Sequence, residues 1–255
     1  MATTSIEWTD KVWNPVTGCS KISPGCKNCY AETIANRFWK DRKFTDVQCH
    51  EDRLEQPIHW KKPSRIFVNS MSDLFHEKVP AKFITDCFSV MEVASWHTFQ
   101  VLTKRPQRFE PVLFDEEGCF YLGAGDYIPN IWLGVSVEDK DTLWRIDKLR
   151  EIQYFCHFVS FEPLLEDVGT VNLEGVDWVI VGGESGPHAR PFDIEWARSI
   201  RDQCKERGIS FFMKQLGSNC IWHTSGRGKR DDSEEWPEDI RIREFPQPEK
   251  EHKNV

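Results

Sequence analysis

The sequence predicts an α/β fold, a partial or complete (β/α) barrel of the TIM type with parallel strands. Three observations lead to this prediction. Nearly continuous apolar runs recur along the chain, each run ends in polar residues, and helical stretches separate the runs. Apolar runs of this kind are typical of parallel strands that are covered on both faces. Their spacing is mostly about the thirty residues that a βαβ unit needs, so the pattern indicates a barrel.

Seven strands are predicted. The first is expected around Lys11 to Asn14, and the others over residues 66–70, 99–103, 131–137, 155–160, 178–183 and 209–214. A chain of 255 residues has an ordinary length for one α/β barrel. The strands and the length therefore agree on a single barrel.

Apolar stripes with helical spacing lie between the strands. The expected buried faces are Ala31, Ile34, Ala35 and Phe38; Phe83, Ile84, Cys87, Phe88 and Met91; Trp144, Leu149 and Ile152; and Trp196, Ala197, Ile200 and Cys204. Asp193 is the expected N-cap of the last helix and Gly208 its C-terminal stop. Cys87 and Cys204 are therefore predicted to be core residues rather than ligands.

We expect the barrel to occupy residues 1–217 and a loop-rich extension to occupy residues 218–255. From Ser218 the strand and helix patterns lapse into a segment rich in glycine, proline and mixed charge. Trp222, Trp236 and Phe245 are the groups through which this extension would pack on the barrel.

Composition limits the function classes. A net charge of −8 argues against nucleic-acid binding by bulk electrostatics, because such affinity comes mainly from Lys and Arg. A local basic groove stays open, with solvated surface charge as the alternative. The chain has no signal peptide and no apolar run of membrane length, and its nine cysteines suit a reducing compartment. We therefore expect a soluble, cytoplasmic protein without a membrane partner.

Three cysteines near the start of the chain carry the main functional signal. Cys19, Cys26 and Cys29 occupy one short segment, and Tyr30 follows directly. Three thiolates can hold three irons of a [4Fe–4S] cluster, which normally takes four protein ligands, and the fourth iron then stays open. The alternatives are a zinc site that begins with the Cys-x2-Cys pair and a purely structural or disulfide role.

This segment resembles the cluster loop of the radical SAM superfamily. Cys26-Lys27-Asn28-Cys29-Tyr30 matches its second half, whereas six residues separate Cys19 from Cys26 where the superfamily usually has three. Further segments, at residues 13–19, 160–165, 182–186 and 214–215, resemble a phage-associated, radical-SAM-like family with a Cys-x6-Cys-x2-Cys loop. The resemblance implies that a [4Fe–4S] cluster binds S-adenosylmethionine (SAM) and that an external one-electron reductant drives its cleavage to a 5′-deoxyadenosyl radical.

The resemblance also implies residues that bind the cofactors. These are Tyr30 in the cluster loop; Asn69, Ser70, Ser72 and Asp73, whose position after the second strand suits the SAM amino group; Ser136 and Glu138 for the ribose; and Gly182 and Gly183 in a glycine-rich strand end. For each of them, a role as a turn or cap residue is the alternative.

Three residues are candidates for catalysis. Glu162 ends a strand and precedes a proline, which favours a positioned carboxylate, and Glu184 follows the glycines and could contact substrate. Lys104, with Arg105, offers cations for an anionic substrate, as do Arg190 and Lys214. A phosphate as the target would indicate a nucleotide or nucleic acid.

Two other functions stay open at this point. One is a barrel enzyme that acts on nucleotides and is stabilised by zinc. The other is a non-catalytic binding protein from a phage or defence locus, with a degenerate cluster fold.

Overall fold

The computed structural model describes residues 4–114, 127–222 and 228–247. Its main sheet has seven strands in the order β1-β4-β5-β6-β7-β8-β9, and every neighbouring pair is parallel. The strands span Lys11–Trp13, Arg65–Val68, Thr98–Thr103, Ile131–Ser136, Cys156–Phe161, Trp178–Gly182 and Ser210–Gln215. All seven predicted strands are confirmed.

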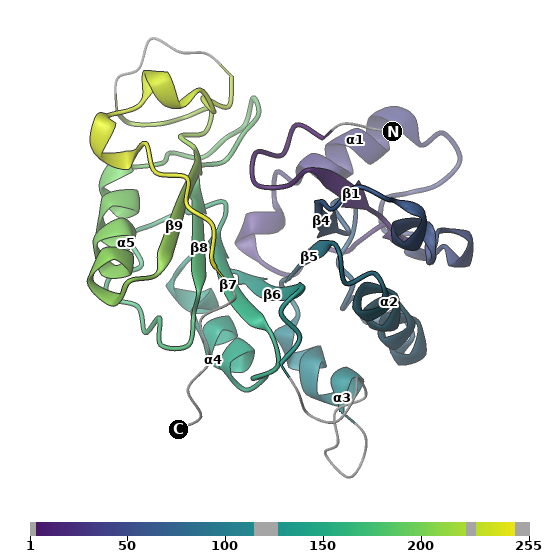
Figure 1. The fold of residues 1–255 in the computed structure, drawn as a ribbon. Coiled ribbons are helices and arrows are strands. Elements are labelled where there is room, and N and C mark those ends of the chain that lie inside the picture. Colours follow the sequence, from purple (N-terminus) through teal and green to yellow (C-terminus); the bar gives the residue numbers. More distant parts are fainter. Residues whose placement is uncertain (1–3, 115–126, 223–227, 248–255) are drawn as a thin grey trace.

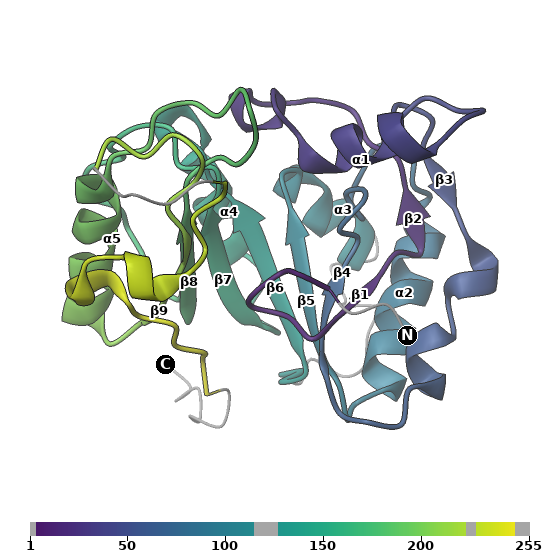
Figure 2. The same cartoon turned by 90° about the horizontal axis from the view of Figure 1, so that it is seen from above.

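The sheet curls into a partial TIM-type barrel that is open between β1 and β9, the two ends of the strand order. Helices α2 (Ala81–Val93), α3 (Phe109–Leu113), α4 (Trp144–Arg150) and α5 (Ile194–Arg207) cover its outer, convex face (Figure 1). Helix α1 (Tyr30–Phe38) and the cysteine segment before it lie across one end of the strands (Figure 2). The predicted barrel is therefore confirmed in its partial form.

Smaller elements complete the fold. Strands β2 (Val16–Thr17) and β3 (Gln48–Cys49) form a separate antiparallel pair. Short 3-10 helices span Pro24–Cys26, Glu51–Arg53, Gln56–His59, Pro106–Arg108, Lys140–Thr142, Ser233–Glu235 and Glu238–Ile240. Among the described helices, none is long and apolar enough to cross a bilayer.

The apolar core has two main parts. The larger part fills the space between the sheet and its outer helices and includes Cys87 and Cys204, both fully buried as predicted. The other part fills the concave side of the sheet and is largely aromatic: Trp8, Phe67, Trp132, Phe158, Trp178 and Phe212 are buried there, and Phe245 packs against them. Segments from both ends of the described chain thus pack into the concave side of the sheet.

The helical stripes are mostly confirmed. In α5, the Asp193 side chain accepts a hydrogen bond from the Glu195 amide, and Gly208 ends the helix at φ 67°. The expected face of α1 is wrong in part, because only Ala31 and Ala35 are buried. Ile34 and Phe38 are 41% and 64% exposed, since α1 lies at the end of the sheet with no layer above it. Trp144 is likewise 43% exposed rather than buried.

The described part of the C-terminal extension packs on the barrel. Residues near its end pair antiparallel with β9 through Phe212 and Arg243, and the Trp178 indole donates to the Glu244 carbonyl at 2.9 Å. Trp236 is buried, whereas Trp222 is 38% exposed. The domain boundary at residues 217 and 218 stays a prediction.

Candidate cofactor and active site

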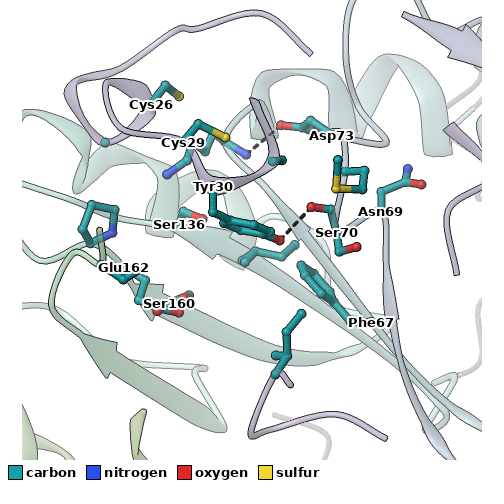
Figure 3. A pocket seen from close by; sticks show the side chains of 18 of the residues that line it. Cys26, Cys29, Tyr30, Phe67, Asn69, Ser70, Asp73, Ser136, Ser160 and Glu162 are labelled. Atoms are coloured by element: carbon teal, nitrogen blue, oxygen red, sulfur yellow. Dashed lines mark hydrogen bonds between the residues drawn. The ribbon is translucent and has the colours of Figure 1, made fainter. Parts of the chain in front are cut away.

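One cavity of about 630 Å³ collects side chains from the carboxyl ends of the strands. Ser136 and Ser160 end or nearly end β6 and β7, Glu184 follows β8, and Lys214 lies at the end of β9. The cysteine segment and the turn after β4 complete the wall. Figure 3 shows Cys26 and Cys29 beside Tyr30, with Ser136, Ser160 and Glu162 on one side and Asn69 and Phe67 on the other. Active sites of parallel barrels lie at this end of the strands.

Most of the predicted site residues reach this cavity. Those that line it are Cys19, Cys26, Cys29, Tyr30, Asn69, Ser70, Ser72, Asp73, Lys104, Ser136, Glu162, Gly183 and Glu184. Glu138 and Gly182 are not among the lining residues. Glu138 is instead fully buried behind the wall.

The three cysteines are half-buried and unbridged. Burial, followed by the nearby Asp73 carboxylate, raises the pKa of Cys19 to about 12, with Arg105 and Cys26 also close enough to act on it. Burial raises the pKa of Cys29 as well, and the charge of Cys26 adds to this. All three thiols line the same cavity, and metal binding at them would release protons.

The donor chemistry fits an iron–sulfur cluster. Within the described ranges, no three His, Cys, Asp or Glu side chains converge closely enough to hold a metal ion. A structural zinc takes four ligands, and the described residues that line the cavity supply three thiols and no histidine. On a [4Fe–4S] cluster each thiolate binds a different iron, so its ligands surround a larger body and need not converge.

Arg105 anchors the first part of the cysteine segment. Its guanidinium donates to the Ser20 carbonyl at 2.9 Å and to the Cys19 sulfur at 3.6 Å. It is held in place by Asp73 and Glu77, each at 3.1 Å. Arg105 is 2% exposed, so a buried charge network fixes the position of Cys19.

Glu138 anchors the middle of the segment. Its carboxylate accepts from the Ser23 hydroxyl at 2.7 Å, from Arg145 at 2.9 Å and from Lys104. Burial alone would raise the pKa of Glu138, but the cations Lys104 and Arg145 outweigh it and hold the pKa below its usual 4.5. Gly25 is needed here because a Cβ on it would lie 2.4 Å from the Glu138 side chain.

Glu184 and Arg190 anchor the last part. The Asn28 amide, between Cys26 and Cys29, donates to the Glu184 carboxylate at 3.0 Å. Arg190 bonds the same carboxylate at 2.5 Å and the Pro24 carbonyl at 2.9 Å. Burial acts to raise the pKa of Glu184, and the hydrogen bonds from Arg190 and Asn28 bring it below its usual 4.5. The long cysteine segment is thus tied to the ends of β5, β6 and β8.

These anchors include residues that sequence reasoning assigned differently or missed. Arg105 and Arg190 were predicted to meet an anionic substrate, and Ser23 and Asn28 had no assigned role. For two arginines, Arg145 and Arg190, the sequence does hold a signal. Buried strand-end carboxylates need partners, and Arg145 and Arg190 follow Glu138 and Glu184 at seven and six residues.

Three polar groups in the wall have no hydrogen-bond partner in the described structure. The Ser160 hydroxyl and the Asn69 amide nitrogen are buried without one. The Ser136 hydroxyl, directly across the β6–β7 ladder from Ser160, makes none of the hydrogen bonds found there. Asn69 also has φ 62°, a left-handed conformation that strains a non-glycine residue and often marks a functional site. These groups are suited to a polar ligand.

Other predicted residues already have partners. The Ser72 hydroxyl donates to the Val16 carbonyl at 2.8 Å, and Asp73 is bound by Arg105. The Ser70 carbonyl accepts from the Tyr30 hydroxyl at 2.7 Å. Of the turn after β4, the Asn69 amide is therefore the side-chain group best placed for a new hydrogen bond.

The cations that line the cavity in the described part of the chain are all paired with carboxylates. The pairs are Lys104 with Glu138, Arg105 with Asp73 and Glu77, Lys214 with Glu162, and Lys229 with Glu7 and Asp231. A phosphate would have to compete with these carboxylates. The predicted role of Lys104 in holding an anionic substrate stays a prediction.

Gly182, the last residue of β8, and Gly183 after it are required by local packing. A Cβ on Gly183 would lie 2.3 Å from the Leu216 carbonyl oxygen, and one on Gly182 would lie 3.0 Å from the Glu162 carboxylate. Close approach of the chain after β9 therefore requires Gly183, whatever binds in the cavity.

A family model described as "Protein of unknown function (DUF5131)" matches residues 3–246. The chain belongs to this family. A search of curated proteins finds no match. Among solved structures, a spore photoproduct lyase mutant with bound AdoMet and dinucleoside spore photoproduct is 11% identical, with a TM-score of 0.46 over 81% of this chain and 56% of that chain. A second mutant of spore photoproduct lyase is 13% identical, with a TM-score of 0.48 over 90% of this chain and 71% of that one.

Proposed function

We propose that this protein is a radical SAM-type iron–sulfur enzyme. Cys19, Cys26 and Cys29 would hold three irons of a [4Fe–4S] cluster and leave the fourth open for SAM. The observation that carries the proposal is that three thiols and the unpartnered polar groups of the strand ends line the same cavity. When bound, the cluster and SAM supply a 5′-deoxyadenosyl radical for hydrogen abstraction. The phage association implied by the motif resemblance is part of this proposal.

The chain's own residues would bind and orient the cofactors. Arg105, Glu138 and Glu184 hold the cysteine segment from three strand ends, which keeps the three thiols in fixed positions. The Asn69 amide nitrogen would donate a hydrogen bond to SAM, and the Ser136 and Ser160 hydroxyls would donate to SAM or accept from it. We assign Asn69 to its amino acid end and Ser136 to its ribose.

The substrate would lie between the SAM site and the apolar part of the wall. Trp8, Val12, Phe67 and Leu102 line that part, which favours a substrate with an apolar or aromatic portion. Glu162, paired with Lys214 at 2.6 Å, is the carboxylate we propose to contact it. A nucleotide or nucleic acid is the substrate class we propose, and an external one-electron reductant completes the reaction.

Iron content tests the proposal. Anaerobically purified protein is expected to contain about four irons per chain and, after reduction with dithionite, an EPR signal that SAM perturbs. A variant with Cys19, Cys26 and Cys29 changed to alanine should lose both. The matched control changes Cys49 and Cys220, two cysteines outside the cavity, to alanine. This control should keep both the iron and the EPR signal. Stoichiometric zinc would favour the zinc-stabilised enzyme, and a cluster indifferent to SAM would favour the binding protein.

A further inference from the structure

Helix α1 presents an apolar stripe to solvent. Tyr30, Ile34 and Phe38 follow one another at steps of four residues and so share one face. Their side chains are 47%, 41% and 64% exposed. Ile22, 43% exposed, lies in the preceding segment, which Lys21 ties to α1 through Glu32 at 2.7 Å. An apolar helix face without a covering layer marks an interaction surface.

Four exposed cations lie on α1 or within five residues of its ends. Lys27, Arg37, Lys40 and Lys43 are exposed, and no carboxylate pairs with them within the described residues. Residues 27–43 carry Arg42 as well as these four cations, against Glu32 and Asp41. The stretch is therefore net positive in a chain with a net charge of −8. An apolar centre with a charged rim is the usual anatomy of a protein–protein interface. We call Ile22, Ile34, Phe38 and the four cations the α1 patch.

The α1 patch adjoins the cysteines. Helix α1 begins at Tyr30, directly after Cys29, and Tyr30 and Ile34 also line the cavity. The patch is therefore the surface that continues outward from the proposed cluster. An electron entering from outside would have a short path at this face.

We propose that the α1 patch is the docking surface for an acidic one-electron carrier protein, an inference that rests on the proposed function. The carrier loses one electron and the cluster gains it, and no bond forms or breaks. The locally positive rim would steer an acidic carrier to this face rather than to the rest of the surface. A nucleic acid fits less well, because a long polyanion would extend beyond the α1 patch onto the acidic surface around it, whereas a small carrier protein would not. The Phe38 ring is also engaged, because Arg37 lies over it at 5.3 Å.

The test compares reduction by two reductants. A charge variant carries Arg37→Glu, Lys40→Glu and Lys43→Glu, and an apolar variant carries Ile22→Ser and Phe38→Ser. The control carries Lys61→Glu, Lys62→Glu and Lys205→Glu, exposed positions near the amino ends of β4 and β9, away from the cysteines. Each iron-loaded protein is mixed anaerobically with a reduced, purified acidic flavodoxin or with dithionite, and cluster bleaching is followed by stopped flow.

The flavodoxin rate constant should fall about tenfold or more in the charge variant at low ionic strength, and it should also fall in the apolar variant. Dithionite rates and iron content should match the wild type, and the control should react like the wild type. An unchanged flavodoxin rate in both variants overturns the docking surface. If the wild type is a dimer and the variants are monomers, the α1 patch binds a second copy of the chain instead. If the variants no longer bind a single-stranded oligonucleotide that the wild type binds, the α1 patch binds nucleic acid instead. If the anaerobically purified wild-type protein contains no iron, the proposed function is overturned as well.

Discussion

Arg105 shows why the cysteine segment has a defined shape at the level of single residues. Its guanidinium meets carboxylates on one side and the Ser20 carbonyl and Cys19 sulfur on the other. Only Arg offers several donors in a rigid fork, which a Lys cannot reproduce. The same side chain thus neutralises the buried Asp73 and positions a proposed cluster ligand.

Arg105→Met should therefore lower the free energy of unfolding by about 3 kcal/mol, because Asp73 is left buried without its partner. It should also lower iron retention, since Cys19 loses its donor. Arg105→Lys, which keeps the charge, should lose less stability. Urea unfolding and iron content measure the two effects, with Arg37→Met at the surface as control. If Arg105→Met and Arg37→Met have the same free energy of unfolding and the same iron content, Arg105 does not anchor the cysteine segment.

Glu138 makes the stability depend on pH. Its pKa in the folded protein lies below the usual 4.5, so its stabilisation is complete above about pH 4.5 and is lost as pH falls through the lowered pKa. Glu138→Gln should cost about 3 kcal/mol at neutral pH, because Lys104 and Arg145 lose their charged partner. Urea unfolding between about pH 7 and pH 3 should show the gap between wild type and variant narrowing on acidification. A gap that stays constant would mean that Glu138 is not ionised in the fold.

The anchors themselves could not be read from local sequence. Ser23 and Glu138 are 115 residues apart, and Asn28 and Glu184 are 156 apart. The ends of β5, β6 and β8 all contribute residues to the lining of one cavity. Which polar groups pair with each other depends on the path that the cysteine segment takes across the carboxyl ends of the strands. Spacing alone does not determine such a path.

Among the elements, the strands were predictable and the face of α1 was not. A strand buried on both faces, such as β8 (Trp178–Gly182), is apolar throughout, so its pattern requires no knowledge of its neighbours. Helix α1 has an apolar stripe like that of α2, yet α2 packs on the sheet and α1 lies across its end. An apolar stripe predicts that something covers it, and for α1 we propose a partner protein.

Helix α5 allows a quantitative test at this scale, because both of its ends follow sequence rules. Asp193→Ala removes the acceptor for the Glu195 amide, 3.0 Å away, and should cost about 1 kcal/mol. Asp193→Asn keeps an acceptor and should cost less. Both are measured as shifts of the urea midpoint. Equal losses from Asn and Ala would show that the charge of Asp193, rather than its capping hydrogen bond, stabilises the helix.

At the scale of the whole molecule, a barrel that stops at seven strands has to close its open side by other means. Trp8, from the first described segment, packs edge-on against Phe67 of β4 and Trp178 of β8, and its carbonyl accepts from the buried Gln100 at 3.1 Å. Phe245, near the other end, packs against Trp178 and lies over Arg65 of β4 at 3.9 Å. Two segments far apart in sequence thus cover the concave side of the seven-stranded sheet.

Phe245→Ala tests this closure. The ring is half-buried and contacts Trp178 and Phe212 at centroid distances of 5.4 and 5.3 Å, so its loss should cost about 2 kcal/mol, less than for a fully buried phenylalanine. Phe38→Ala, at an exposed ring, should change stability very little. Since Phe245 packs on the concave aromatic core and does not line the cavity, iron content should stay unchanged. A cost no larger than that of Phe38→Ala would mean that the end of the chain leaves the barrel open in solution.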